Sequence, residues 1–292
     1  MKTNATQTAA GLENNCECNR AFTLTELLVV MATLAILAAV ILPALAKSGD
    51  NGMQTVCLNN LKQMGMALNM YVAENQDTMP WVNLGNDASP PVPPGWLYKG
   101  SPNAPIDLGA GPTPAADANR WYHMRGQNLA GGVYWQYLQN QDAFVCPVDT
   151  LAVGTTLWDA RAMKLSTYIM NGASAFLPPR VNDNAFGRKT CKMSQIWSPL
   201  CIINWEPNDK TSQGGAGAFA YNDGSSYPDT WEGMGRIHVT GANVLSVGGS
   251  SRFISYADYV AQVHHNAKGE TSKGKGLLYW NPNRADGHGT DE

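Results

Sequence analysis

Charged residues are scarce in this chain of 292 residues. Lys and Arg together number 20 and Asp and Glu number 23, so the four types make up 15% of the sequence, against the usual quarter. The formal net charge of −3 leaves no basic excess, and nucleic acid is therefore not indicated as a partner. Aromatic residues, at 9%, exclude a solvated disordered protein. We expect a globular chain that is long enough to bury a substantial core.

Cysteine and catalytic motifs are also sparse. Six cysteines are too few for a small scaffold held by disulfides, and no Cys-x-x-Cys pair predicts a zinc site. The sequence lacks the Gly-x-Ser-x-Gly, His-Glu-x-x-His and P-loop patterns. We therefore predict that the protein is not an enzyme. A membrane-anchored hydrolase is a rival interpretation, and it would need a pocket of titratable groups that the sequence does not display.

One long uncharged run stands out near the start of the chain. Residues 27–46 contain no charged side chain. As a helix they would span roughly 30 Å, the thickness of the hydrocarbon core of a bilayer. No second run of this kind occurs, so the chain crosses a membrane at most once. Three interpretations compete: a secretory signal cut after the small-x-small pattern Ala-Leu-Ala at 44–46, a plain anchor, and a third that depends on Glu26.

Glu26 lies inside the longer apolar run 22–46, four residues after Phe22. A carboxylate inside a membrane is costly, and an intramembrane ionisable group indicates a function with a partner of opposite charge. No basic side chain lies in the run. Cleavage just before Phe22 would create an α-amino group one helical turn from Glu26, and this amine is a suitable partner.

The N-terminal residues carry a resemblance to a known family. Residues 20–30, Arg-Ala-Phe-Thr-Leu-Thr-Glu-Leu-Leu-Val-Val, resemble the processing motif of type IV pilins and type II secretion pseudopilins. The resemblance implies that a prepilin peptidase cuts between Ala21 and Phe22 and methylates the new amine of Phe22. It also implies that Glu26 pairs with the N-terminus of a neighbouring subunit during assembly, and that Pro43 kinks the helix. Ala21 replaces the glycine that the family prefers before the cut.

This resemblance and the sequence pattern divide the chain into four parts. We expect a leader peptide at 1–21, a transmembrane and assembly helix at 22–46, an amphipathic stalk helix at 47–79, and a globular head with a flexible C-terminal tail at 80–292. The glycines of segment 47–52 predict a break between the two helices, with Asp or Asn capping the second, whereas the resemblance implies a helix that continues through this segment.

The stalk shows helical periodicity. Its apolar positions are Cys57, Leu61, Met64, Leu68 and Tyr71. Three methionines, at 64, 66 and 70, are expected to pack against the head.

The expected fold class is α+β and pilin-like: a long N-terminal membrane-spanning helix followed by a mostly antiparallel β head with long loops. Residues 81–114 are rich in Pro, Gly and Asn and predict an extended surface loop. Strands or strand ends are predicted at 144–147, 167–171, 201–205 and 242–247, short helical structure at 132–138, and a surface helix from Tyr256 onward.

A second resemblance lies in the head. Residues 236–245 resemble the C-terminal motif of a large G-type pseudopilin-like subgroup, in which a His is followed by nine residues and then Asp-Gly. Here His238 begins the motif, and Gly248 and Gly249 occupy the place of Asp-Gly. A strand and a turn are compatible with Gly-Gly in place of Asp-Gly, whereas any role of the Asp side chain is lost. We expect His238 to be a hydrogen-bonded structural residue rather than a catalyst.

Four cysteines remain once the leader, with those at 16 and 18, is removed. Three pairings are possible in a compartment where disulfides persist. We favour Cys57 with Cys146 and Cys191 with Cys201; the alternative is four buried free thiols.

No cofactor is predicted, but calcium is one candidate. Residues 222–229, Asn-Asp-Gly-Ser-Ser-Tyr-Pro-Asp, offer oxygen ligands without full EF-hand spacing, as in some pseudopilins. A simple turn is the alternative for this segment.

The sequence therefore predicts a pilin-like structural subunit of a type IV pilus or type II secretion pseudopilus. Its expected partners are prepilin peptidase, other pilin-like subunits, the inner-membrane assembly platform and the lipid bilayer. The expected location is the cytoplasmic membrane, crossed once, with an extracytoplasmic head that enters a periplasmic or surface filament. The alternative function is a secreted or membrane-anchored binding module, with glycans as one candidate ligand.

Overall fold

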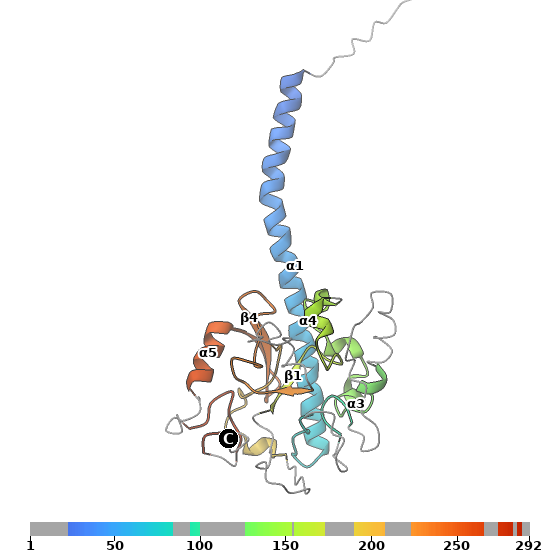
Figure 1. Cartoon of the computed structure of the whole chain (residues 1–292), viewed down its shortest axis with the longest axis vertical. Helices are drawn as coiled ribbons and strands as arrows, with labels where there is room; N and C mark the ends of the chain where they lie inside the picture. Colours follow the sequence, from blue (N-terminus) through green and yellow to red (C-terminus); the bar gives the residue numbers. More distant parts are fainter. Residues whose placement is uncertain are drawn as a thin grey trace, which may run out of the picture. The chain divides into compact units, whose positions relative to one another are not determined.

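The computed structural model describes residues 23–83, 94–99, 126–153, 155–172, 190–207, 223–265, 274–282 and 285–287 (Figure 1). The predicted cleavage residues Ala21 and Phe22, the leader, and most of the predicted loop at 81–114 lie outside the described residues. The chain forms two compact units, Met1–Ser48 and Gly49–Glu292.

Helix α1, Leu24–Glu74, is 51 residues long and belongs to both units. The predicted break at 47–52 is wrong, because these residues are helical. A glycine costs about 1 kcal/mol in a helix interior, which the good helix formers on both sides can offset. Pro43 also lies within α1. The helix ends where Gln76 and Asp77 adopt positive φ angles of 55° and 65°.

The apolar stripe of the C-terminal half of α1 forms the centre of the core. The side chains without exposed surface include those of Cys57, Leu61, Met64 and Leu68, which confirms the predicted spacing. Met66 and Met70 are 52% and 51% exposed, so their predicted packing against the head is wrong. Each follows a buried residue by two positions, a rotation of about 200° that turns its side chain to the opposite face.

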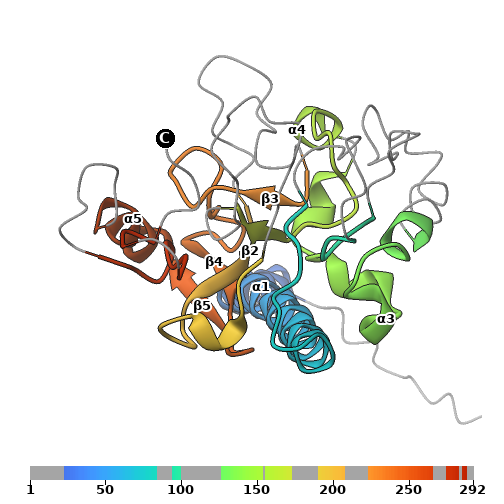
Figure 2. The ribbon, with the colours of Figure 1, turned by 90° about the horizontal axis from the view of Figure 1, so that it is seen from below.

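A five-stranded sheet packs beside this part of α1, in the order β3-β1-β2-β4-β5 (Figure 2). The strands are β1 Ile169–Asn171, β2 Ile202–Trp205, β3 Ser225–Ser226, β4 Gly241–Ser246 and β5 Ser251–Ser255. Three pairs are antiparallel, but β1 and β3 pair in parallel, so the predicted mostly antiparallel sheet is a mixed sheet. The chain between β1 and β3 is long enough for β3 to return in the same direction.

Short helices complete the described part of the head. They are α3 Trp135–Leu138, η2 Gln141–Phe144, η3 Asp149–Ala152, α4 Thr156–Asp159, η5 Met193–Gln195 and α5 Tyr256–His265. In Figure 2, α3 and α5 lie on opposite sides of α1. The predicted strand at 144–147 is wrong, since Phe144 ends η2 and a turn follows. Its short apolar run is buried without pairing to a strand.

The β4–β5 turn lies against α1 at a contact between two glycines. A Cβ on Gly65 would lie only 2.9 Å from the Cα of Gly249, and Gly249 has a φ of +82° that a larger residue rarely adopts. The Gly248 N–H donates to the Pro199 carbonyl at 2.8 Å, and a Cβ there would meet Pro199. Gly248 and Gly249, at the Asp-Gly positions of the resembling motif, therefore lie in the turn between β4 and β5. Because they have no side chains, this turn can pack closely against α1.

One ion pair is buried at the edge of this core. The Arg161 guanidinium donates from Nη1 and Nη2 to the two carboxylate oxygens of Asp149, each at 2.7 Å, and the two side chains are 1% and 3% exposed. The guanidinium also lies 4.6 Å from the ring centroid of Trp158.

Arg161→Ala should lower the free energy of unfolding by about 3–5 kcal/mol, because it removes the two short charge-assisted hydrogen bonds that the buried Asp149 carboxylate accepts from the guanidinium. Chemical denaturation of the purified chain measures this loss. As a control, Tyr137→Phe removes an exposed hydrogen bond to Glu74 and should cost no more than about 1 kcal/mol. Equal effects of the two substitutions would contradict the buried pair.

Candidate functional site

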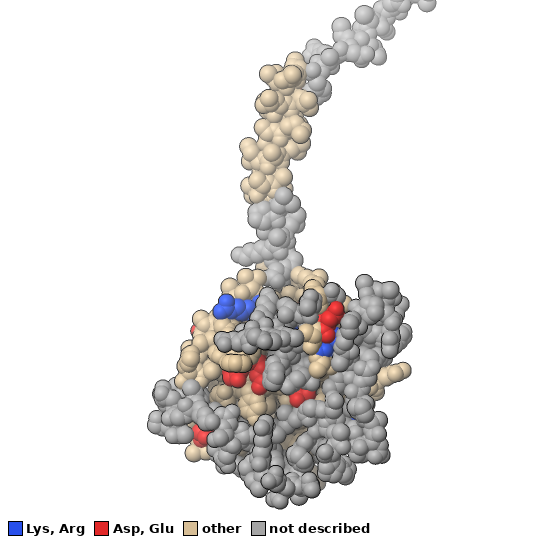
Figure 3. All heavy atoms as spheres, in the orientation of Figure 1, with Lys and Arg blue, Asp and Glu red and all other residues tan. Residues whose placement is uncertain are grey.

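The N-terminal part of α1 is a continuous apolar surface. Residues Leu24–Ile41 have a mean hydropathy of 2.5, and none of this segment is buried. By length and composition this segment is able to cross a membrane. A signal sequence near an N-terminus has the same length and composition, so these two properties do not distinguish an anchor from a signal sequence. On the face that Figure 3 shows, the described part of this segment carries neither basic nor acidic colour.

Glu26 is held in the first turn of α1 by Thr23. The Thr23 N–H and hydroxyl donate to Oε2 of Glu26 at 2.9 and 2.7 Å, and the Glu26 N–H donates back to the Thr23 hydroxyl at 3.2 Å. This reciprocal arrangement is a capping box, which satisfies N–H groups that a helix start leaves unpaired. The carboxylate thus has a local role in the helix that the sequence analysis missed, although the Thr-x-x-Glu pattern was there to find.

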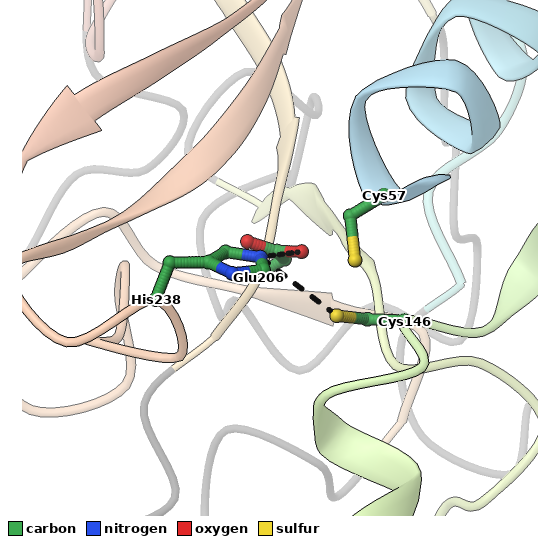
Figure 4. Close-up of side chains that lie close together, drawn as sticks. All are labelled: Cys57, Cys146, Glu206 and His238. Carbon is green, nitrogen blue, oxygen red and sulfur yellow. Dashed lines mark hydrogen bonds and ion pairs between the residues drawn. The ribbon is translucent and has the colours of Figure 1, made fainter. Parts of the chain in front are cut away.

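A second site lies inside the head, where four side chains converge from separate segments. Cys57 belongs to α1, Cys146 follows η2, Glu206 follows β2, and His238 lies in the turn before β4. All four residues are buried, and one possible ligand atom of each lies within 4.8 Å of the others. Figure 4 shows the two sulfur atoms facing the imidazole and the carboxylate. We call these four residues the buried cluster.

The two cysteines of the cluster are tied to their neighbours by buried hydrogen bonds. The Asn60 amide, one turn along α1 from Cys57, donates to the Val145 carbonyl at 2.8 Å. The Cys146 N–H donates to the hydroxyl of Thr167 at 2.5 Å. These bonds hold the segment of Cys146 against α1, so the two thiols face each other.

Glu206 and His238 are held just as firmly. The Asn243 N–H of β4 donates to Oε2 of Glu206 at 2.7 Å, which leaves Oε1 3.2 Å from Nε2 of His238. The same Nε2 lies 3.9 Å from the sulfur of Cys146. In the turn that carries His238, the next residue, Val239, has a φ of 65°, an outlier for a β-branched side chain.

Electrostatics in the cluster favour a charged imidazole at His238 and a neutral thiol at Cys146. Burial lowers the pKa of His238, but the hydrogen bonds to Cys146 and Glu206 outweigh it and raise this pKa to about 10. Burial raises the pKa of the Cys146 thiol well above its usual range, with a further contribution from Cys57. The four groups can therefore hold an imidazolium–carboxylate pair beside two thiols, or together bind a metal ion of matching chemistry.

The four cysteines at 57, 146, 191 and 201 are free and buried in the structure, so neither predicted disulfide is formed among the described residues. Cys57 and Cys146, which form one of the two predicted pairs, nevertheless both belong to the buried cluster. Burial raises the pKa values of Cys191 and Cys201 to about 12.

Glu206 was not foreseen as a site residue. The four ligand-type side chains lie far apart in the sequence, so no spacing motif could reveal them. One signal for Glu206 exists: it is a single carboxylate directly after an apolar strand, where a side chain has a high chance of burial.

The predicted calcium segment contains strand β3 in its described part, with carboxylates that bond to the backbone on either side of it. Oδ1 of Asp223 accepts from the Ser225 N–H at 2.8 Å, and Oδ1 of Asp229 accepts from the N–H groups of Trp231 and Glu232 at 2.7 and 2.8 Å. These contacts are those of the turn alternative. Asn222 lies outside the described residues.

No protein-family model, curated protein or solved structure matches this chain. The function must therefore be inferred from the residues of α1 and of the buried cluster themselves.

The carboxyl group of Glu232 should make stability depend on pH. Burial, and then the nearby charge of Asp229, raise its pKa from 4.5 to about 7. The folded state therefore keeps a proton that the unfolded chain releases, so the contribution of Glu232 to stability falls as pH rises from 4.5 to 7 and does not change further above that.

Glu232→Gln removes this penalty and should be more stable than the wild type by about 1–3 kcal/mol above pH 7. The difference should disappear below pH 4.5. Denaturation curves of both proteins across this range measure the effect, and a difference that does not change with pH would contradict it.

Proposed function

We propose that this protein is a pilin-like structural subunit that prepilin peptidase processes and that assembles into a type IV pilus or a type II secretion pseudopilus. The observation that carries the proposal is the exposed apolar segment Leu24–Ile41 with a single carboxylate in its first turn. An apolar surface of this length needs lipid or other apolar helices to cover it. A filament core made of many copies of this helix supplies such a cover, and the bilayer supplies it before assembly.

Glu26 is suited to pair with the amine of another subunit. Both Thr23 donors bond to Oε2, so Oε1 can accept from an incoming ammonium group without loss of the capping box. Cleavage between Ala21 and Phe22 would create such an ammonium group on each copy. In an apolar core an ion pair of this kind selects one axial register between helices, because any other register leaves both charges unpaired.

The proposal also assigns the other partners and the location. The inner membrane holds the subunit by residues 24–41, and the assembly platform moves the processed helix from lipid into the filament. Unit Gly49–Glu292 is the extracytoplasmic head. On this account the protein is a substrate of a peptidase and has no catalytic role of its own.

The mature N-terminus decides between the proposal and its rivals. Mass spectrometry of the protein purified from its native cells should find a chain that begins at Phe22 and carries one N-methyl group. Ala21→Gly should be processed at least as completely. A chain that begins at Lys47 would indicate a released binding module, and an uncut chain would indicate a plain anchor.

Glu26→Gln separates the two roles of this side chain. Gln also completes a capping box at this position, so the helix start should be kept while the negative charge is lost. We expect normal cleavage and membrane insertion but loss of the subunit from sheared filaments, measured by immunoblot.

Thr23→Val is the matched control, because it removes the hydroxyl of the capping box and keeps the carboxylate. This variant should still enter filaments, at a cost in helix stability of about 1 kcal/mol. Incorporation of Glu26→Gln at the wild-type level would refute the pairing role.

A further inference from the structure

We propose that Cys57, Cys146, Glu206 and His238 form a closed tetrahedral zinc site in the unit Gly49–Glu292. The inference goes beyond filament assembly and does not depend on it, since all four residues belong to this one unit. It begins from their convergence: four ligand-type side chains, all buried, each with a possible ligand atom within 4.8 Å of the other three (Figure 4).

The distances fit a tetrahedron around zinc. Zinc binds sulfur at about 2.3 Å and nitrogen or oxygen at about 2.0–2.2 Å, so neighbouring ligand atoms lie about 3.3–3.8 Å apart. Nε2 of His238 lies 3.2 Å from Oε1 of Glu206 and 3.9 Å from the sulfur of Cys146. Side-chain adjustments of a few tenths of an ångström would complete these two edges, and the other edges, all within 4.8 Å, need to shorten by about 1.5 Å at most.

The donor set selects the metal. Two thiolates with one imidazole favour zinc over the hard cations magnesium and calcium, which prefer oxygen ligands. The carboxylate of Glu206 supplies the fourth ligand, so no open position remains for water or substrate. A site with four protein ligands and no exposed surface is structural rather than catalytic.

A metal ion accounts for all four groups, whereas a disulfide accounts for two. An S–S bond of about 2.05 Å between Cys57 and Cys146 would leave Glu206 and His238 as an ion pair in the interior. A buried carboxylate is costly there, and Glu206 has no exposed surface. A divalent cation would bind all four groups and would offset two of the three negative charges of the carboxylate and the two thiolates, which leaves the site with one negative charge; the protons of the two thiols and of the imidazolium would be released to solvent.

The surrounding hydrogen bonds orient the ligands as a metal site requires. The Asn243 N–H fixes Oε2 of Glu206 and turns Oε1 to the centre of the cluster. The strained φ of 65° at Val239 keeps the turn of His238 tight, with the His238 N–H donating to the Gly241 carbonyl at 3.0 Å. Strain beside a cluster of polar groups is typical of a functional site.

Zinc at this position would cross-link four segments of the head. It would join α1 to the segment after η2, to the end of β2 and to the turn before β4, which are far apart in the sequence. These are the elements that must dock on α1 for the core to form.

Elemental analysis of the full-length chain, purified in detergent with zinc supplied during expression, tests the site. We expect about one zinc ion per chain in the wild type and loss of at least nine-tenths of it in Cys146→Ala and His238→Ala. Cys201→Ala is the matched control, because it removes another buried cysteine outside the cluster, and it should keep its zinc. Zinc retained by Cys146→Ala, or iron or copper in place of zinc, would overturn the assignment.

Measurements on the wild type alone test the site even if the variants fail to fold. Cobalt replacing zinc should give the thiolate charge-transfer band and the strong visible bands of tetrahedral coordination, and chelation should lower the midpoint of thermal unfolding. Weak octahedral cobalt bands, a midpoint that does not respond to the chelator, or a Cys57–Cys146 disulfide found by peptide mapping under non-reducing conditions would each overturn the proposal.

Discussion

The organisation of this protein depends on one constraint: an apolar helix surface must be kept from water. Within the part of the chain that the structure describes, no residue of Leu24–Ile41 is buried. From Cys57 onward the same helix meets the constraint differently, by burying one stripe of side chains in the head. A single helix thus has a uniformly apolar first part, suited to lipid or to copies of itself, and an amphipathic second part, suited to a globular core.

The head is built around that second part. The stripe of α1 forms the centre of the core, and the close approach of Gly65 to Gly249 admits the β4–β5 turn at the same helix. The buried cluster adds polar contacts at the start of the stripe, where Cys57 meets the segments of Cys146, Glu206 and His238. Apolar packing alone is tolerant of small shifts, whereas hydrogen-bonded and ligand-type groups fix one arrangement.

Local patterns predicted those elements whose residues carry their own signal. The 3.6-residue spacing from Cys57 to Leu68 and the β-branched runs of β2 and β4 were found where predicted, as was α5. Local patterns failed where context decides. Glycine-containing residues 47–52 remain helical between strong helix formers, and the apolar run at 144–147 is buried without a strand partner. The parallel pairing of β3 with β1 depends on a long connection between the two strands, and no local sequence pattern indicates it.

The sequence by itself determined the apolar segment and the buried stripe of α1, because periodicity and hydropathy are properties of neighbouring residues. Only the tertiary structure decided which distant side chains meet. Counting cysteines leaves three possible pairings, of which Cys57 with Cys146 belongs to one, and Glu206 and His238 join these two only through strand pairing and a tight turn. Contacts between residues far apart in the chain are fixed by the packing of whole elements, and no spacing in the sequence encodes them.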